Sequence, residues 1–140
     1  MLTPEAVSFI EDFGLLITEG GLPRSMGRVL GLLLICDPHQ QSALQIQQQL
    51  QLSSGSVSAA TTFLYNAGFI KRSSRSGSRR LFYEVDEACW QRVVQSRLHQ
   101  LRHGVSLAER ALSMHPADPR LLSMHHLYSE FERTLSQMKL

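Results

Sequence analysis

The sequence contains few of the features that secreted proteins, membrane proteins and many enzymes depend on. Cysteine occurs only as Cys36 and Cys89, which favours a reduced, cytoplasmic setting over a disulfide framework. The apolar run at residues 29–36 is far shorter than the roughly 20 residues that cross a bilayer, so we expect no membrane span. Residues 1–5 lack the basic start of a signal peptide. No Gly-rich phosphate loop, nucleophile elbow or paired-carboxylate motif occurs, so we expect neither an enzyme nor a cofactor.

The distribution of charge says more than its total. The 140 residues carry a net charge of only +2, and the apolar fraction of 43% is that of an ordinary globular protein. The first 22 residues hold four acidic residues and no basic one. Residues 71–80 hold no acidic residue and five basic ones, namely Lys71, Arg72, Arg75, Arg79 and Arg80. A local basic patch of this kind is typical of nucleic-acid binding.

Residues 42–68 follow the pattern of two short helices joined by a tight turn. Ser42 and Gln45 are spaced as a capping box, which predicts a helix start at this point. Ser53 is placed to cap the second helix. That helix has one apolar stripe and an opposite face of small, uncharged residues. Gly68 is expected to end it in the left-handed conformation. The predicted stripe consists of Val57, Ala60, Thr61 and Leu64.

Two strand-like runs follow, at residues 69–72 and 80–85, with a turn-rich tip at 73–78. Leu81, Tyr83 and Val85 alternate along the second run, as in a half-buried strand. The order helix, turn, helix, hairpin predicts a winged helix-turn-helix. A helix of small polar residues can enter a DNA major groove, and a basic hairpin can reach the adjacent backbone or minor groove.

From this arrangement we predict a DNA-binding surface on the second helix and the hairpin. Arg79 and Arg80 are adjacent at the start of the second strand, so we expect their side chains to point to opposite faces, with only one of them directed at the groove. A protein-protein adaptor with a merely solvated hairpin remains an alternative. The candidate DNA-binding residues are Ser42, Ser53, Ser54, Ser56, Ser58, Ala59, Thr62, Arg72, Arg75, Arg79 and Arg80.

The chain also resembles the MarR family of bacterial transcriptional regulators, and most closely its GbsR-like branch. The resemblance covers about residues 15–90 and rests on the order and spacing of several weak motifs: residues 21–28 (GLPRSMGR), 37–38, 52–58, 64–70 and 77–83. Three residues depart from the family pattern. Gln47 stands where a small residue is usual, Gln51 where the turn often has Gly, and Ser78 where an Asp commonly braces the wing arginine.

The resemblance implies a dimeric repressor that binds double-stranded promoter DNA. The family pattern also makes Arg79 the first choice for the groove contact and Arg80 the second. It further implies a cleft for a small-molecule effector, where the dimer helices meet the DNA-binding lobe. Regulators of this branch often govern osmolyte or choline uptake. The effector, the target sequence and the direction of regulation are not specified by the residues, and we name no ligand.

The segments on either side of the lobe are predicted to be helical. Thr3, Pro4 and Glu5 form a helix start, and a second helix runs from Pro23 to Cys36, where Gly27 and Gly31 allow another helix to approach. After the hairpin, Asp86 caps a long helix to about residue 113, and Asp118 starts the last one. That last helix carries a heptad seam, which favours a homodimer over packing within one chain. The seam consists of Leu121, Met124, Tyr128, Phe131, Leu135 and Met138.

Two further candidate sites are weaker. His99 and His103 lie one helical turn apart, a spacing that can bind a metal, although exposed helix histidines are the commoner explanation. A metal-responsive regulator therefore stays as an alternative. A redox role for Cys36 would require a basic, partly exposed site.

The predicted fold class is mainly α: a winged helix-turn-helix with a small β-hairpin wing, embedded in a helical dimerisation scaffold. We expect one compact unit with three parts. These are N-terminal scaffold helices at 1–37, the DNA-binding lobe at 38–85, and C-terminal dimerisation helices at 86–140.

Overall fold

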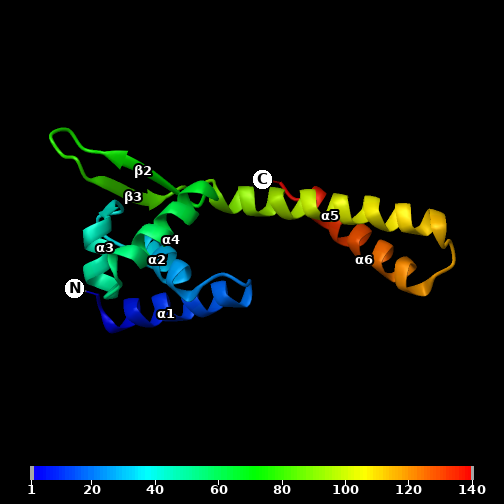
Figure 1. Ribbon diagram of the computed structural model, residues 1–140, viewed down its shortest axis with the longest axis horizontal. Coiled ribbons are helices and arrows are strands. Elements are labelled where there is room, and N and C mark those ends of the chain that lie inside the picture. The colour runs from blue at the N-terminus through cyan, green and yellow to red at the C-terminus, as the bar shows by residue number, and fades with distance from the viewer. Residues whose placement is uncertain (1, 140) are drawn as a thin grey trace. The chain divides into compact units, whose positions relative to one another are not determined.

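A computed structural model describes residues 2–139 of the chain. The chain divides into two compact units, one ending at Cys89 and one spanning Trp90–Leu140, and each is described by itself. The structure is mainly helical with a small antiparallel sheet of three strands, and a β-hairpin projects from the helices of the first unit (Figure 1). The predicted mainly α, winged helix-turn-helix fold is confirmed.

The first unit is built around the central helix α2 (Arg24–Ile35), which contacts α1 (Pro4–Glu19), α3 (Ala43–Leu50), α4 (Ser54–Asn66) and the sheet. Thr3 caps α1 as predicted, because its Oγ1 accepts a hydrogen bond from the Ala6 N–H at 3.1 Å. Buried apolar side chains of α2 and its neighbours form one core. Its most buried members include Ile10, Leu30, Leu32, Ile46 and Leu64.

Two glycines set the distance between α1 and α2. A Cβ on Gly27 would lie 2.8 Å from the Gly14 Cα, and one on Gly31 would lie 3.3 Å from the Phe13 Cβ. The predicted close approach of another helix at Gly27 and Gly31 is therefore confirmed, and the approaching helix is α1.

The sheet has the order β1-β3-β2, with β1 at Gln41–Ser42, β2 at Ile70–Ser74 and β3 at Leu81–Val85. Strand β1 was not predicted from the sequence; its two residues pair antiparallel with Tyr83 and Phe82. The predicted first strand of the hairpin also ended too early. Because β2 continues to Ser74, the hairpin tip comprises residues 75–80 and not 73–78.

The burial of β3 differs in part from its predicted alternation. Tyr83 and Val85 pack against the core, but Leu81 is 41% exposed. Leu81 pairs with Ser74, the last residue of β2. This pair lies next to the hairpin tip, away from the core. Phe82, on the opposite face, is only 8% exposed, because the Arg75 guanidinium lies over its ring. The buried residue at the end of the hairpin is therefore Phe82.

The second unit consists of α5 (Cys89–Met114), apart from its first residue, and α6 (Pro119–Ser136), which lie side by side as a helical hairpin (Figure 1). Ion pairs join Arg102 to Glu132 at 3.1 Å and His125 to Glu109 at 3.3 Å. The Tyr128 ring lies directly on Gly104, where an added Cβ would approach within 2.2 Å of the ring carbons. This glycine contact and these ion pairs join the two helices, and Ala108 of α5 is fully buried.

The predicted ends of these two helices need correction. Asp86 does accept a hydrogen bond from the Ala88 N–H at 3.0 Å, but it closes a turn, and α5 begins at Cys89. Asp118 caps α6 as predicted, with its Oδ1 accepting from the Arg120 N–H at 2.9 Å. Since α6 ends at Ser136, Met138 lies outside it and the heptad seam ends at Leu135. No residue of α6 is buried in the single chain.

Candidate nucleic-acid interface

The helix-turn-helix begins at a capping box that the structure confirms in full. The Ser42 Oγ accepts from the Gln45 N–H at 3.2 Å, and the Gln45 Oε1 accepts from the Ser42 N–H at 2.8 Å. Because Ser42 also belongs to β1, the same residue starts α3 and joins it to the wing strand β3. Ser42 is only 3% exposed, so our proposal for DNA contact no longer includes it. The Ser42 side chain is buried, and its hydroxyl oxygen accepts the capping hydrogen bond of α3.

The turn between α3 and α4 contains a strained residue. Gln51 has φ 54° and ψ 42°, and it is the one non-glycine residue with a positive φ among residues 2–139. An L-residue with a Cβ is disfavoured there by roughly 1–2 kcal/mol. Gln51 stands where the turn of the MarR family often has glycine, and its left-handed conformation explains why glycine would suit this position.

We therefore expect Gln51→Gly to stabilise the protein by about 0.5–1 kcal/mol, since glycine adopts this conformation without the steric cost. Urea titration followed by circular dichroism would measure the free energy of unfolding. The matched control is Gln48→Gly, an exposed position within α3, where glycine should destabilise the helix by about 1 kcal/mol. Equal losses of stability in both variants would contradict the argument from backbone strain.

Helix α4 separates a buried face from an exposed one. The predicted stripe of Val57, Ala60, Thr61 and Leu64 is buried as expected, and the Thr61 hydroxyl donates to the Val57 carbonyl at 2.9 Å. Gly68, with φ 83°, follows the helix as predicted. The opposite face is uncharged and open. Its exposed residues among the candidates are Ser54, Ser58, Ala59 and Thr62.

Ser53 and Ser56, two of the predicted DNA-binding serines, also take part in capping α4. The Ser53 Oγ accepts from the Ser56 N–H at 3.1 Å, which caps α4, and the two hydroxyl oxygens are 3.0 Å apart in a further hydrogen bond. Ser53 is exposed and Ser56 is half-buried. These two hydroxyls hold the start of the helix, whereas those of Ser54, Ser58 and Thr62 have no such restraint from capping.

Three of the five basic residues of the wing are held by neighbours. Lys71 Nζ lies 3.9 Å from Glu84 Oε1 across the β2–β3 pair. The Arg72 guanidinium carbon lies 4.0 Å from the centre of the Tyr65 ring, and that of Arg75 lies 3.9 Å from the centre of the Phe82 ring. Cation–π contacts of this kind fix the direction of an arginine without neutralising its charge.

The other two wing cations, Arg79 and Arg80, have no hydrogen-bond, ion-pair or ring partner for their side chains within residues 2–139. Both lie before β3, so the strand that was expected to place their side chains on opposite faces does not include them. The Ser78 Oγ accepts from the Arg80 N–H at 3.1 Å. Ser78 therefore braces the backbone and leaves both guanidinium groups available to a ligand.

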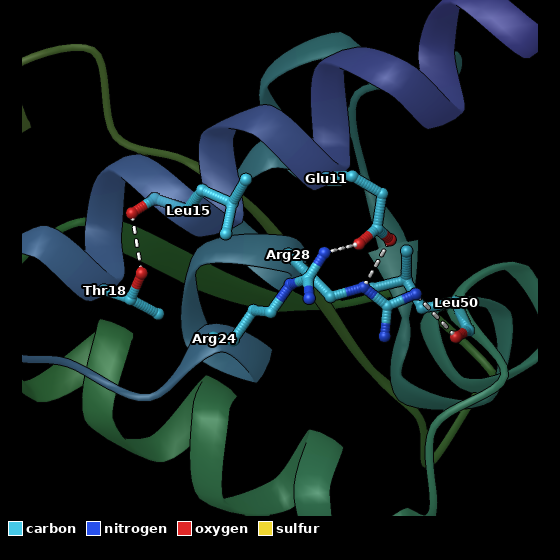
Figure 2. Close-up of polar contacts among 6 residues, drawn as sticks. All are labelled: Glu11, Leu15, Thr18, Arg24, Arg28 and Leu50. Atoms are coloured by element: carbon cyan, nitrogen blue, oxygen red, sulfur yellow. Dashed lines mark hydrogen bonds and ion pairs between the residues drawn. The ribbon is translucent and has the colours of Figure 1, made fainter.

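A polar cluster links α1 and α2 to the end of α3 (Figure 2). Glu11 accepts from Arg24, and its Oε1 accepts from Arg28 Nε at 2.8 Å. Arg28 also donates to the carbonyl of Leu50 at 3.1 Å, one residue before the strained Gln51. Sequence reasoning missed this cluster. The four-residue spacing of Arg24 and Arg28 was a signal for a shared partner, but nothing local pointed to Glu11.

Comparisons with known proteins agree with this geometry. No protein-family model matches the chain. The chain is 31% identical over 138 residues to the HTH-type transcriptional regulator MmpR5 of Mycobacterium tuberculosis, covering 95% of this chain and 84% of that protein. The chain belongs to this family of HTH-type transcriptional regulators. A crystal structure of a transcriptional regulator also matches, with 30% identity, a TM-score of 0.72, and coverage of 95% of this regulator and 94% of that chain.

The remaining candidate residues of the regulator lie in other environments. His99 and His103 are on exposed turns of α5, and no group of three or more His, Cys, Asp or Glu side chains within the described residues could hold a metal ion. Cys36 and Cys89 are buried and are not joined in a disulfide, and burial raises the pKa of the Cys36 thiol. A raised pKa lowers the thiolate fraction and so the reactivity of Cys36. Among residues 2–139, no helix has the length and apolar character needed to cross a membrane.

Proposed function

We propose that this regulator is a dimeric, cytoplasmic, sequence-specific DNA-binding repressor of the MarR family, in its GbsR-like branch. Helix α4 would enter the major groove, and the wing would meet the adjacent backbone or minor groove. One observation carries the proposal: the uncharged open face of α4 shares a unit with an acid-free hairpin tip whose Arg79 and Arg80 are unpartnered within residues 2–139.

The open face of α4 supplies groups suited to reading base edges. Each hydroxyl of Ser54, Ser58 and Thr62 can donate one hydrogen bond and accept others, which fits both purine and pyrimidine edges. The methyl group of Ala59 can contact the methyl group of thymine. No acidic residue occurs on α4 to repel phosphates. The helix can therefore approach the groove closely.

The wing supplies the charge that α4 lacks. Guanidinium groups bind phosphate oxygens with two parallel hydrogen bonds. Arg79 and Arg80 would not have to leave a partner to do so, whereas Arg75 would leave the Phe82 ring. We therefore assign the main wing contacts to Arg79 and Arg80, and a weaker one to Arg75.

The second copy in the proposed dimer would cover apolar surface that the single chain leaves open. On α6, Leu127 is 54% exposed and Phe131 is 60% exposed, and on α1 Leu16 is 57% exposed. A groove of about 770 Å³ lies between α5 and α6, with Leu101, Tyr128, Phe131 and Leu135 among its lining residues. Exposed apolar surface of this extent marks protein-protein contact sites.

Two-fold symmetry of such a dimer would require a near-palindromic DNA site, with half-sites about 34–36 Å apart or a multiple of that spacing. From the MarR resemblance we further propose that a small-molecule effector alters this DNA binding. Thermal shift screening with candidate solutes, followed by DNA titration with any stabilising solute, would test for it.

A titration of fluorescent promoter DNA at several salt concentrations tests the proposed function. Specific binding that weakens steeply with salt supports it, because bound cations release counterions from DNA. The promoter fragments are those upstream of the regulator's own gene. Failure to bind any fragment at low salt would instead favour a protein-protein adaptor, with the hairpin only solvated.

In the same assay, Arg79→Ala should weaken binding and lower the salt slope by about one unit, because one phosphate contact is lost. Arg75→Ala is the matched comparison, and it should have a smaller effect because Arg75 is stacked on Phe82 in the free protein. If both variants bind as tightly as the parent with an unchanged slope, the hairpin is not a DNA-binding wing.

A further inference from the structure

The contact between Arg72 and Tyr65 joins the wing to helix α4. Tyr65 lies in the last turn of α4, and Arg72 lies in the middle of β2. The guanidinium carbon is 4.0 Å from the centre of the ring. The ring that holds Arg75 and the carboxylate that holds Lys71 belong to β3, within the hairpin itself, and Arg75 also donates to Gln40 Oε1 at 3.5 Å, just before β1. The Arg72–Tyr65 pair is thus a bridge from the proposed recognition helix to the wing.

The chain between these two elements is short and contains a glycine. Residues 67–69 connect α4 to β2, and Gly68 adopts φ 83° there. The Phe69 N–H donates to the Leu64 carbonyl at 2.9 Å, which fixes the start of the hairpin. Ile70 is buried, but every residue from 71 to 80 is exposed. Beyond Ile70, β2 has no buried side chain of its own, and it is tied to the core through its pairing with β3.

Arg72 is an exposed residue of β2 and pairs with Tyr83, which packs against the core. Its guanidinium lies over the Tyr65 ring and so restrains the exposed part of β2 against α4. Tyr65 is 38% exposed, so the contact adds little to the hydrophobic core. What it does control is the angle between two elements that would have to meet the same DNA molecule.

We propose that Tyr65 and Arg72 are positioning residues, which hold the wing at a fixed angle to the recognition helix so that both reach DNA together. This inference rests on the proposed DNA-binding function. It assigns Arg72 to the aromatic ring and not to a phosphate. The contact orders part of the wing before DNA binds. Such preorganisation raises affinity without a new contact to the ligand.

The test compares four variants with the parent in the DNA titration: Tyr65→Leu, Tyr65→Phe, Arg72→Met, and the double variant Tyr65→Leu with Arg72→Met. Tyr65→Leu removes the ring and should weaken specific binding by roughly two- to five-fold, the range expected for an exposed cation–π contact. Tyr65→Phe keeps a ring and should bind as the parent does. Arg72→Met should match Tyr65→Leu, and its salt slope should stay at the parent's value.

The double variant should be no weaker than either single variant, because both remove the same contact. Binding to a fragment without the operator should change less than specific binding, since a mispositioned wing can still find phosphates there. Thermal melts of all four variants verify that each is folded. A merely structural role would lower the melting temperature of Tyr65→Leu and Arg72→Met together with their affinity, whereas positioning residues change DNA binding in a protein that melts as the parent does.

Two outcomes overturn the inference in distinguishable ways. If Arg72→Met lowers the salt slope by about one unit and its effect adds to that of Tyr65→Leu, Arg72 contacts a phosphate and the bridge is not its function. In that case the proposed DNA binding stands. If the parent itself binds no promoter DNA at low salt, the proposed function fails and this inference fails with it.

Discussion

Replacing Leu127 and Phe131 together with glutamate is expected to convert the proposed dimer into a folded monomer. Both side chains are more than half exposed in the single chain, at 54% and 60%, so the substitutions should leave the fold of one chain intact. In the dimer, two carboxylates per subunit would become buried without partners. That should weaken association by about 4 kcal/mol or more, on the order of a thousand-fold in the dimer dissociation constant.

Sedimentation velocity at several protein concentrations would measure the change, and the DNA titration would show loss of tight binding to a palindromic site. The matched control is His126→Glu, an exposed position on the opposite side of α6 from the apolar seam. This control should remain dimeric. A Leu127→Glu, Phe131→Glu protein that sediments as the parent dimer would show that α6 is not the interface.

The second large effect concerns the packing of α1 on α2. Gly27→Ala should lower the free energy of unfolding by about 1–3 kcal/mol, because the new Cβ would lie 2.8 Å from both the Gly14 Cα and the Ile17 Cβ. Backbone on one side and a β-branched side chain on the other leave no flexible group to give way. The α1 helix would have to move, and with it Glu11, the partner of Arg28.

Gly55→Ala is the control for the Gly27 variant. Gly55 lies in the first turn of α4, where an added Cβ would meet only Ser53 Oγ at 4.0 Å. Alanine there should be neutral or stabilise the protein by up to about 1 kcal/mol through its higher helix propensity. Chemical denaturation would measure both variants. If Gly27→Ala has the same free energy of unfolding as the parent, α1 and α2 can move apart without a loss of stability.

The parts of the fold that the sequence predicted well depend on residues a few positions apart. The Ser42 capping box, the buried stripe of α4 and the left-handed Gly68 each follow from local geometry, and all three are confirmed. The same holds for Asp118 at the start of α6. Spacing of three or four residues was enough to identify them, because helix geometry sets both the caps and the faces.

The parts that were missed depend on residues far apart in the chain. Strand β1 forms only because Gln41 and Ser42 meet β3, about 40 residues later. The partners of the wing arginines, Tyr65 and Phe82, are likewise chosen by how the hairpin folds back. Composition identified a basic wing, but it could not separate held cations from unpartnered ones. That distinction is the one on which the assignment of DNA contacts now rests.

The strand order of the sheet has a consequence for how the protein behaves at high concentration. Since β3 is central, β2 is an edge strand, and its outer N–H and C=O groups could pair with a strand from another molecule. Lys71 and Arg72 stand on that edge, and the opposite edge, β1, has only two residues. Charge on one edge and shortness of the other are the features that prevent edge-to-edge aggregation in β-sheet proteins. The basic residues of the wing are thus also expected to disfavour pairing of β2 with the edge strand of a second molecule.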